Sequence, residues 1–168
     1  ATEPGLTAAF AHVFNHGITK GALFLLAGAM VLRLGGTRWR HLEGVGRTMP
    51  LTAFAFVIGG LSLIGVPGTA GFASKWALLQ AALAAGRPAL AAVVVLSSLL
   101  AVAYVWRFVE HAYFREPPAG HPPPGEAPAS MTAPALALTA LVVAAGLYAS
   151  PVLEAALGAA RALLGAAP

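Results

Sequence analysis

The chain contains no cysteine and no aspartate, and only two of its 168 residues are lysine. Without cysteine it cannot form disulfides, thiolate metal sites or iron–sulfur clusters. Without aspartate it cannot form a Ser–His–Asp set, and no carboxylate or thiol lies near His12 and His16 to complete a metal site. No basic stripe carries interleaved aromatic residues, so nucleic-acid binding is not indicated. We therefore expect no catalytic residue, no metal and no cofactor.

Charged residues are also scarce. They make up 10% of the chain, whereas 58% is hydrophobic and the mean hydropathy is +0.78. A soluble domain carries about a quarter charged residues, so this chain has too little polar surface to cover a soluble core. Its apolar runs are long enough to cross a lipid bilayer. The composition predicts an all-α, multi-pass protein of the cell (inner) membrane.

Four apolar segments, 6–34, 51–86, 88–113 and 132–150, predict about four crossings. The second would be about 54 Å long as a straight helix, far more than one crossing needs. Its middle reads GVPGTAG, and a proline with three glycines disfavours continuous helix there. The segment is therefore either one crossing broken at mid-membrane or a tight hairpin, and we expect the broken crossing. The residues that break it are Gly65, Pro67, Gly68 and Gly71.

The expected organisation is a core of three crossings over 1–114, a Pro-rich loop over 115–131, and a last span with a short interfacial helix over 132–168. Arginines mark the loop after the first segment and its edge, which by the positive-inside rule makes that loop cytoplasmic. With one broken crossing, the Pro-rich loop is also cytoplasmic and both ends of the chain face outside. A hairpin would instead place the Pro-rich loop outside and the C-terminal end in the cytoplasm. The arginines are Arg33, Arg38, Arg40 and Arg47.

His12, His16 and Lys20 follow one another at intervals of four within the first apolar segment. On a helix this spacing makes one polar stripe about 12 Å long. Histidine titrates near neutral pH and a buried lysine can release its proton, so waters between these groups would form a proton wire. The alternatives are an interfacial His12, a helix-packing hydrogen bond at His16, and a Lys20 that snorkels. Snorkelling fails if the segment is centred in the bilayer, because the stem reaches about 6 Å and the interface is about 15 Å away.

Lys75 directly follows the break. Unwound backbone within a membrane is tolerated where it is buried in protein or lines a wet cavity, and transporters use broken helices in this way. We expect the freed carbonyls, with the hydroxyls of Ser74 and Thr69, to stabilise the ammonium. The alternative is a proline kink with a lysine near one interface.

Arg107, Glu110 and His111 cluster at the end of the third segment. Their spacing of three and four residues indicates a salt-bridged rim at the membrane interface. The alternative is a proton exit site.

Two stretches, HVFNHGITKGALFLLAGAM and HLEGVGRTMPLTAFAFVIGGLSLIGVPGTAGFASKWALL, resemble a family of proton-conducting antiporter-like membrane subunits. The pattern occurs in the antiporter-like subunits of respiratory complex I and in the multisubunit Na⁺/H⁺ (Mrp-type) antiporter. The form GVPGTAGFASKW is most similar to the D subunit of that antiporter. The resemblance is sharp from about His12 to Leu79.

The resemblance implies that Lys75 is the lysine of a discontinuous helix on a central polar axis that passes protons. His12, His16 and Lys20 are implied to be the polar stripe leading to that axis. The implied fold has inverted five-helix repeats. This chain, which begins ATEPG and lacks the essential glutamate and lysines of the first repeat, is expected to be the C-terminal part.

The expected function is proton translocation as one subunit of a multisubunit cation/proton antiporter, with other subunits as partners and Na⁺ as a candidate counter-ion of the whole complex. The first alternative is a complex I or membrane-bound hydrogenase subunit that couples quinone or hydrogen redox chemistry to proton pumping. The second, of another class, is a non-transporting structural subunit or truncated fragment. A membrane enzyme is disfavoured because no catalytic set is visible.

Overall fold

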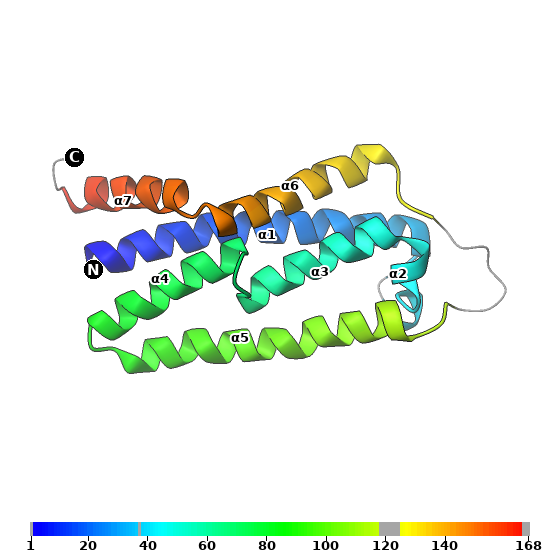
Figure 1. Ribbon diagram of the computed structural model, residues 1–168, viewed down its shortest axis with the longest axis horizontal. Coiled ribbons are helices and arrows are strands. Elements are labelled where there is room, and N and C mark those ends of the chain that lie inside the picture. The colour runs from blue at the N-terminus through cyan, green and yellow to red at the C-terminus, as the bar shows by residue number, and fades with distance from the viewer. Residues whose placement is uncertain (1, 37, 118–124, 166–168) are drawn as a thin grey trace.

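The computed structural model describes residues 2–36, 38–117 and 125–165, and these form helices and loops with no strand among them. The long helices run roughly parallel to one another, along the long dimension of an elongated bundle (Figure 1). The predicted all-α fold is confirmed, although residues 118–124 of the predicted Pro-rich loop and the last three residues of the predicted tail lie outside the described residues. The helices are α1 (Glu3–Leu34), the 3-10 turn η1 (Trp39–His41), α2 (Val45–Thr48), α3 (Pro50–Ile64), α4 (Ala70–Ala84), α5 (Pro88–Val109), the π-helical turn η2 (Glu110–Phe114), α6 (Ala129–Leu147) and α7 (Ser150–Leu164).

Three helical stretches in the described part of the chain are long and apolar enough to cross a membrane: α1, α5 continued by η2, and α6. The helix α1 begins at an N-cap, where the Thr2 hydroxyl accepts a hydrogen bond from the Gly5 N–H at 3.3 Å. It ends at Gly35, whose φ of 73° is the left-handed conformation typical of a helix C-terminus. These three stretches correspond to the first, third and fourth predicted segments.

The fourth crossing is made of two half-helices. Each of α3 and α4 has 15 residues, about 22 Å, so neither alone spans a hydrocarbon core of about 30 Å. Figure 1 shows α3 and α4 following one another along the bundle rather than lying side by side as a hairpin. Between them Gly65 and Gly68 have φ values of 92° and 88°, which favour glycine. The predicted broken crossing is therefore confirmed, and the hairpin alternative is wrong.

The loop after α1 and the segment before α6 lie at the same end of the bundle. Arg33 at the end of α1 donates a hydrogen bond from Nε to the Gly125 carbonyl at 3.2 Å. The Glu126 carboxylate accepts one from the Leu51 N–H at 2.7 Å and another from the Thr52 N–H at 3.3 Å, at the start of α3. Two crossings, the broken one and α5, separate these two segments along the chain, so the chain returns to the same end. This arrangement agrees with the prediction that, with one broken crossing, the loop after the first segment and the Pro-rich loop lie on the same side of the membrane.

Two adjacent glycines let α3 pack closely against its neighbours. A Cβ atom added at Gly59 would lie 2.8 Å from the Leu23 side chain of α1, and one at Gly60 would lie 2.9 Å from the Val105 side chain of α5. Small residues of this kind allow membrane helices to approach one another, where hydrocarbon itself gives little driving force for association. These contacts hold α3 between α1 and α5.

The helix α7 lies along the N-terminal half of α1, beyond the end of α6 (Figure 1). Nε of Arg161 on α7 lies 3.2 Å from Oε2 of Glu3 on α1, so an ion pair joins the two helices. The predicted place of this tail at the membrane interface stays a prediction.

Candidate functional site

The ammonium of Lys75, on the second turn of α4, has all three of its N–H donors occupied. Nζ donates to the Leu63 carbonyl at 2.5 Å, to the Ile64 carbonyl at 3.3 Å and to the Ser98 hydroxyl at 2.8 Å. A buried charge is costly unless it is paired or fully hydrogen-bonded, and here backbone and hydroxyl oxygens do this. Lys75 is therefore held, half-buried, at the break between α3 and α4, and this break lies midway along the bundle (Figure 1).

The two carbonyls are available because of how α3 ends. The N–H groups of Gly65 and Val66 both donate to the Leu61 carbonyl, so the chain turns out of the helix there. Pro67, the residue four after Leu63, has no N–H to offer that carbonyl. The end of a helix leaves such carbonyls unpaired and carries partial negative charge, which favours a cation. The expectation that freed carbonyls stabilise Lys75 is confirmed.

The expectation about the hydroxyls is wrong. The Ser74 hydroxyl contacts Nδ1 of His12 at 3.0 Å, and the Thr69 hydroxyl donates to the Val66 carbonyl at 2.7 Å. Ser74 precedes Lys75, so its side chain points about 100° away around the helix, toward α1. The hydroxyl that reaches the ammonium belongs to Ser98 on α5 instead.

A second polar layer joins α1 to the two half-helices. The Ser62 hydroxyl accepts a hydrogen bond from the Gly71 N–H at 3.0 Å and lies 3.0 Å from the Thr19 hydroxyl. Nδ2 of Asn15 donates to the Ala70 carbonyl at 2.8 Å. The sequence interpretation did not single out the buried side chains of Asn15, Thr19 and Ser62. The signal was available for Asn15, because it is the only asparagine in the chain and lies within an apolar segment, between two histidines.

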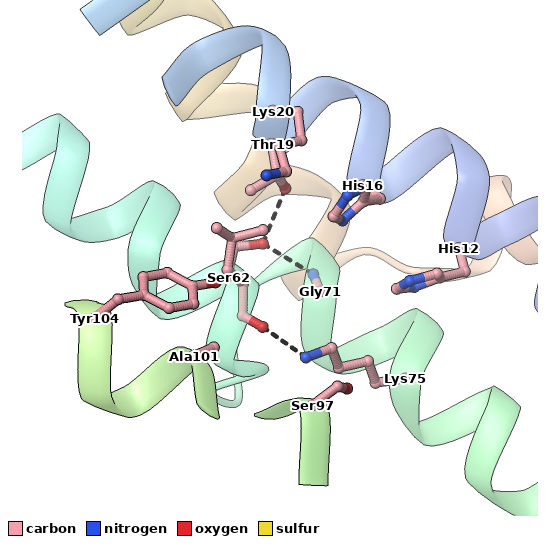
Figure 2. Close-up of a pocket in the computed structure, with 11 residues that line it drawn as sticks. His12, His16, Thr19, Lys20, Ser62, Gly71, Lys75, Ser97, Ala101 and Tyr104 are labelled. Carbon is pink, nitrogen blue, oxygen red and sulfur yellow. Dashed lines mark hydrogen bonds between the residues drawn. The ribbon is translucent and has the colours of Figure 1, made fainter. Parts of the chain in front are cut away.

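A cavity of about 290 Å³ lies among α1, α3, α4 and α5 (Figure 2). His12, His16 and Lys20 of α1 border it together with Lys75 of α4 and Tyr104 of α5. A cavity of this size, with several polar side chains in its walls, has room for several waters. The structure therefore brings the four predicted proton-transfer residues around one space.

The members of the histidine–lysine stripe differ in their contacts. The rings of His12 and His16 are stacked, with centroids 5.5 Å apart. Lys20 is half-buried at the cavity wall and donates no hydrogen bond to the residues that the structure describes. Among the described residues, neither His16 nor Lys20 makes a side-chain hydrogen bond to another helix, as His12 does with Ser74.

The predicted rim lies in the last turn of α5 and in η2, and none of its three residues lines the cavity. The guanidinium of Arg107 lies 5.0 Å from the Trp39 ring centroid, and the His111 ring lies 4.9 Å from it. Glu110 does not pair with Arg107; its carboxylate lies 2.8 Å from the guanidinium of Arg115. The contacts of Arg107 and His111 with Trp39 hold η1 against the end of α5, and a role of the rim in proton exit stays a prediction.

The fold is that of a membrane protein with several helical crossings. A broken membrane helix with a lysine on its free carbonyls, beside a cavity lined with histidine and lysine, resembles the broken helices that transporters use. Residues 1–101 match the model of the family described as "NADH:quinone oxidoreductase/Mrp antiporter, TM". The chain belongs to this family, which confirms the predicted resemblance.

The chain is similar to named proteins of both kinds that the family description mentions, NADH-quinone oxidoreductases and antiporters. The chain is 43% identical to NADH-quinone oxidoreductase subunit N of Desulforudis audaxviator over 155 residues, which is 85% of this chain and 31% of the relative. It is 30% identical to the D subunit of the Na(+)/H(+) antiporter of Alkalihalophilus pseudofirmus over 91% of this chain and 31% of the relative. The Mrp complex from Dietzia sp. contains a chain that superposes with a TM-score of 0.87 at 32% identity, covering 95% of this chain and 38% of that one. The chain thus spans about a third of the length of the curated relatives that it matches.

Proposed function

We propose that this chain forms a proton-conducting part of a membrane subunit in a multisubunit cation/proton antiporter, with Lys75 as the central proton carrier. The observation that carries the proposal is the position of the Lys75 ammonium. It is held at a helix break in the middle of the bundle and faces a cavity that His12, His16 and Lys20 also border.

Within this cavity a proton would pass by water between Lys75 and the groups of α1. Like charges repel strongly where solvent is scarce, so a proton that arrives on Lys20 or His16 disfavours the charge on Lys75. Loading of one group therefore promotes release from the other. A change in a neighbouring charge, from another subunit or from the exchanged cation, would drive the transfer in one direction.

The proposal is tested by proton flux in vesicles that contain the complex with the full-length subunit. Lys75→Ala removes the carrier, and Lys75→Arg keeps the positive charge but cannot release its proton at usable pH. Both variants are expected to abolish flux. Gln80→Ala, on the exposed face of the same helix, is the control and is expected to match the wild type. Wild-type flux in Lys75→Ala, or retained flux in Lys75→Arg, would contradict a carrier role.

A complex I-type assembly is the second candidate, because the relative with 43% identity is named NADH-quinone oxidoreductase subunit N. The two candidates differ in the driving force. Flux that follows an imposed Na⁺ gradient supports the antiporter, and flux that requires electron transfer to quinone supports the redox-coupled assembly. If flux is unaffected by alanine at Lys75, Lys20 and His16 together, the chain is a non-transporting structural subunit.

A further inference from the structure

We infer that Ser98 is a positioning residue for proton transfer at Lys75, because its hydroxyl can pair with the lysine in both protonation states. The inference rests on the proposed function, since it concerns how the proposed carrier releases its proton. Ser98 lies on α5, 23 residues after Lys75, and is half-buried. Its Oγ accepts from Nζ of Lys75 at 2.8 Å and lies 3.2 Å from the Val94 carbonyl, to which it can donate.

The three oxygen atoms around Nζ are not equivalent. The Leu63 and Ile64 oxygens are carbonyls, which only accept hydrogen bonds. They suit the ammonium, which has three donors, but they offer nothing to the lone pair of a neutral amine. A hydroxyl both accepts and donates. Among the described residues that bond Nζ, Ser98 is therefore the one that can stabilise the neutral form as well as the charged form.

The exchange needs little rearrangement. For release, one N–H of Lys75 first turns from its oxygen partner to a cavity water. That N–H bond then breaks, the proton goes to the water and the electron pair stays on Nζ. Rotation about the Cε–Nζ bond brings that lone pair to face Ser98, and the two remaining N–H groups stay on the two carbonyls. The Ser98 O–H turns from the Val94 carbonyl to Nζ. That carbonyl keeps its helical partner, which is the backbone N–H of residue 98 itself.

Ser97 gives a matched comparison. It is the adjacent serine of the same helix, and its hydroxyl also donates to the Val94 carbonyl, at 2.8 Å. It borders the cavity, but its hydroxyl does not bond Lys75. Ser97→Ala and Ser98→Ala therefore each remove one hydroxyl from α5. Only Ser98→Ala removes a hydrogen-bond partner of the Lys75 ammonium.

The experiment measures proton flux against pH in vesicles that contain the complex with the full-length subunit, with its amount quantified. Ser98→Ala is expected to lower flux about tenfold more than Ser97→Ala, the size expected for loss of one hydrogen bond to a charged group. Ser98→Thr, which restores a hydroxyl, is expected to recover most of the flux. Ser98→Ala is also expected to alter the shape of the pH profile, whereas a packing defect lowers flux by the same factor at every pH.

The outcomes separate this inference from the proposed function. If Lys75→Ala abolishes flux but Ser98→Ala equals Ser97→Ala, the role of Ser98 is overturned and the carrier role of Lys75 stands. If Ser98→Thr is as impaired as Ser98→Ala, or if the pH profile keeps its shape, the loss reflects packing and the inference is also overturned. If Lys75→Ala itself retains flux, the proposed function fails, and the role of Ser98 fails with it.

Discussion

His12 on α1 and Ser74 on α4 are joined by a hydrogen bond of 3.0 Å between Nδ1 and Oγ. The Ser74 hydroxyl also lies within 3.3 Å of the Ala70 carbonyl of its own helix. The contact fixes His12 at the edge of the cavity, one helical turn from His16. A fixed histidine at this place can serve as a proton-transfer group or as a structural link between α1 and α4.

These two roles of His12 are separated by His12→Gln. Glutamine can keep a hydrogen bond to Ser74 but does not titrate. If His12 transfers protons, flux in vesicles falls at least tenfold while the complex assembles in normal amount, because general acid–base groups contribute on the order of a hundredfold or more. Wild-type flux in His12→Gln, with a loss confined to His12→Ala, assigns His12 a structural role only.

Gly71 allows the start of α4 to touch the end of α3. A Cβ atom at this position would lie 1.8 Å from the Ser62 carbonyl oxygen, which is backbone and cannot turn aside. We predict that Gly71→Ala displaces α4, lowers the free energy of unfolding by about 1–3 kcal/mol, and abolishes flux because Lys75 leaves its carbonyls. Thermal unfolding of the purified complex and flux measure the two effects.

Gly17→Ala is the control for that substitution. Gly17 is a helical glycine of α1, between His16 and Ile18, and a Cβ atom there meets nothing within 4 Å. Its replacement by alanine is expected to leave stability unchanged or to raise it by up to about 1 kcal/mol, because alanine favours helix. Equal losses in the two glycine variants would mean that the close approach at Gly71 is not the cause.

Glu126 ties the segment before α6 to the start of the broken crossing. Its carboxylate accepts from two backbone N–H groups at the N-terminus of α3, and the negative charge is favourable there. Glu126→Gln is expected to destabilise the start of α3 by about 0.5–2 kcal/mol, measured as faster hydrogen exchange in its first turn. Glu116→Gln, at an exposed residue of the same connection, should leave that exchange unchanged. Unchanged exchange in both variants would show that the Glu126 charge does not stabilise α3.

The ion pair between Arg161 and Glu3 is expected to contribute little. Their side chains are 42% and 40% exposed, and ion pairs at such positions are worth about 0.2–1 kcal/mol. A double-mutant cycle with Arg161→Ala and Glu3→Ala, scored by thermal unfolding, should give a coupling in this range that shrinks as salt is raised. A coupling above about 2 kcal/mol would mean that the pair is shielded, for example by a further part of the assembly.

Much of the fold follows from patterns that lie close together in the sequence. The length of an apolar run is set by the thickness of the bilayer, so the crossings could be located within a few residues. The proline and glycines of GVPGTAG cannot continue a helix, so the break was also predictable. The stripe His12, His16, Lys20 follows from helical periodicity, and the structure places all three at one cavity.

The partners of each polar group were less predictable. Sequence proximity suggested Ser74 and Thr69 for Lys75, but adjacent residues on a helix point in different directions. Ser98 comes from a different helix, whose rotation depends on the packing of Val105 against Gly60. The link of Ser62 to Thr19 likewise depends on how α3 lies against α1.

The sequence by itself determined that this protein crosses the membrane several times, where one crossing is interrupted, and which side chains can carry a proton there, because hydrophobicity, backbone stereochemistry and ionisation are properties of single residues and short runs. Only the tertiary structure decided that the two half-helices continue one another and that a serine of α5 completes the surroundings of Lys75. The physical reason is that contacts between helices depend on side-chain shape across an interface, which no local pattern specifies.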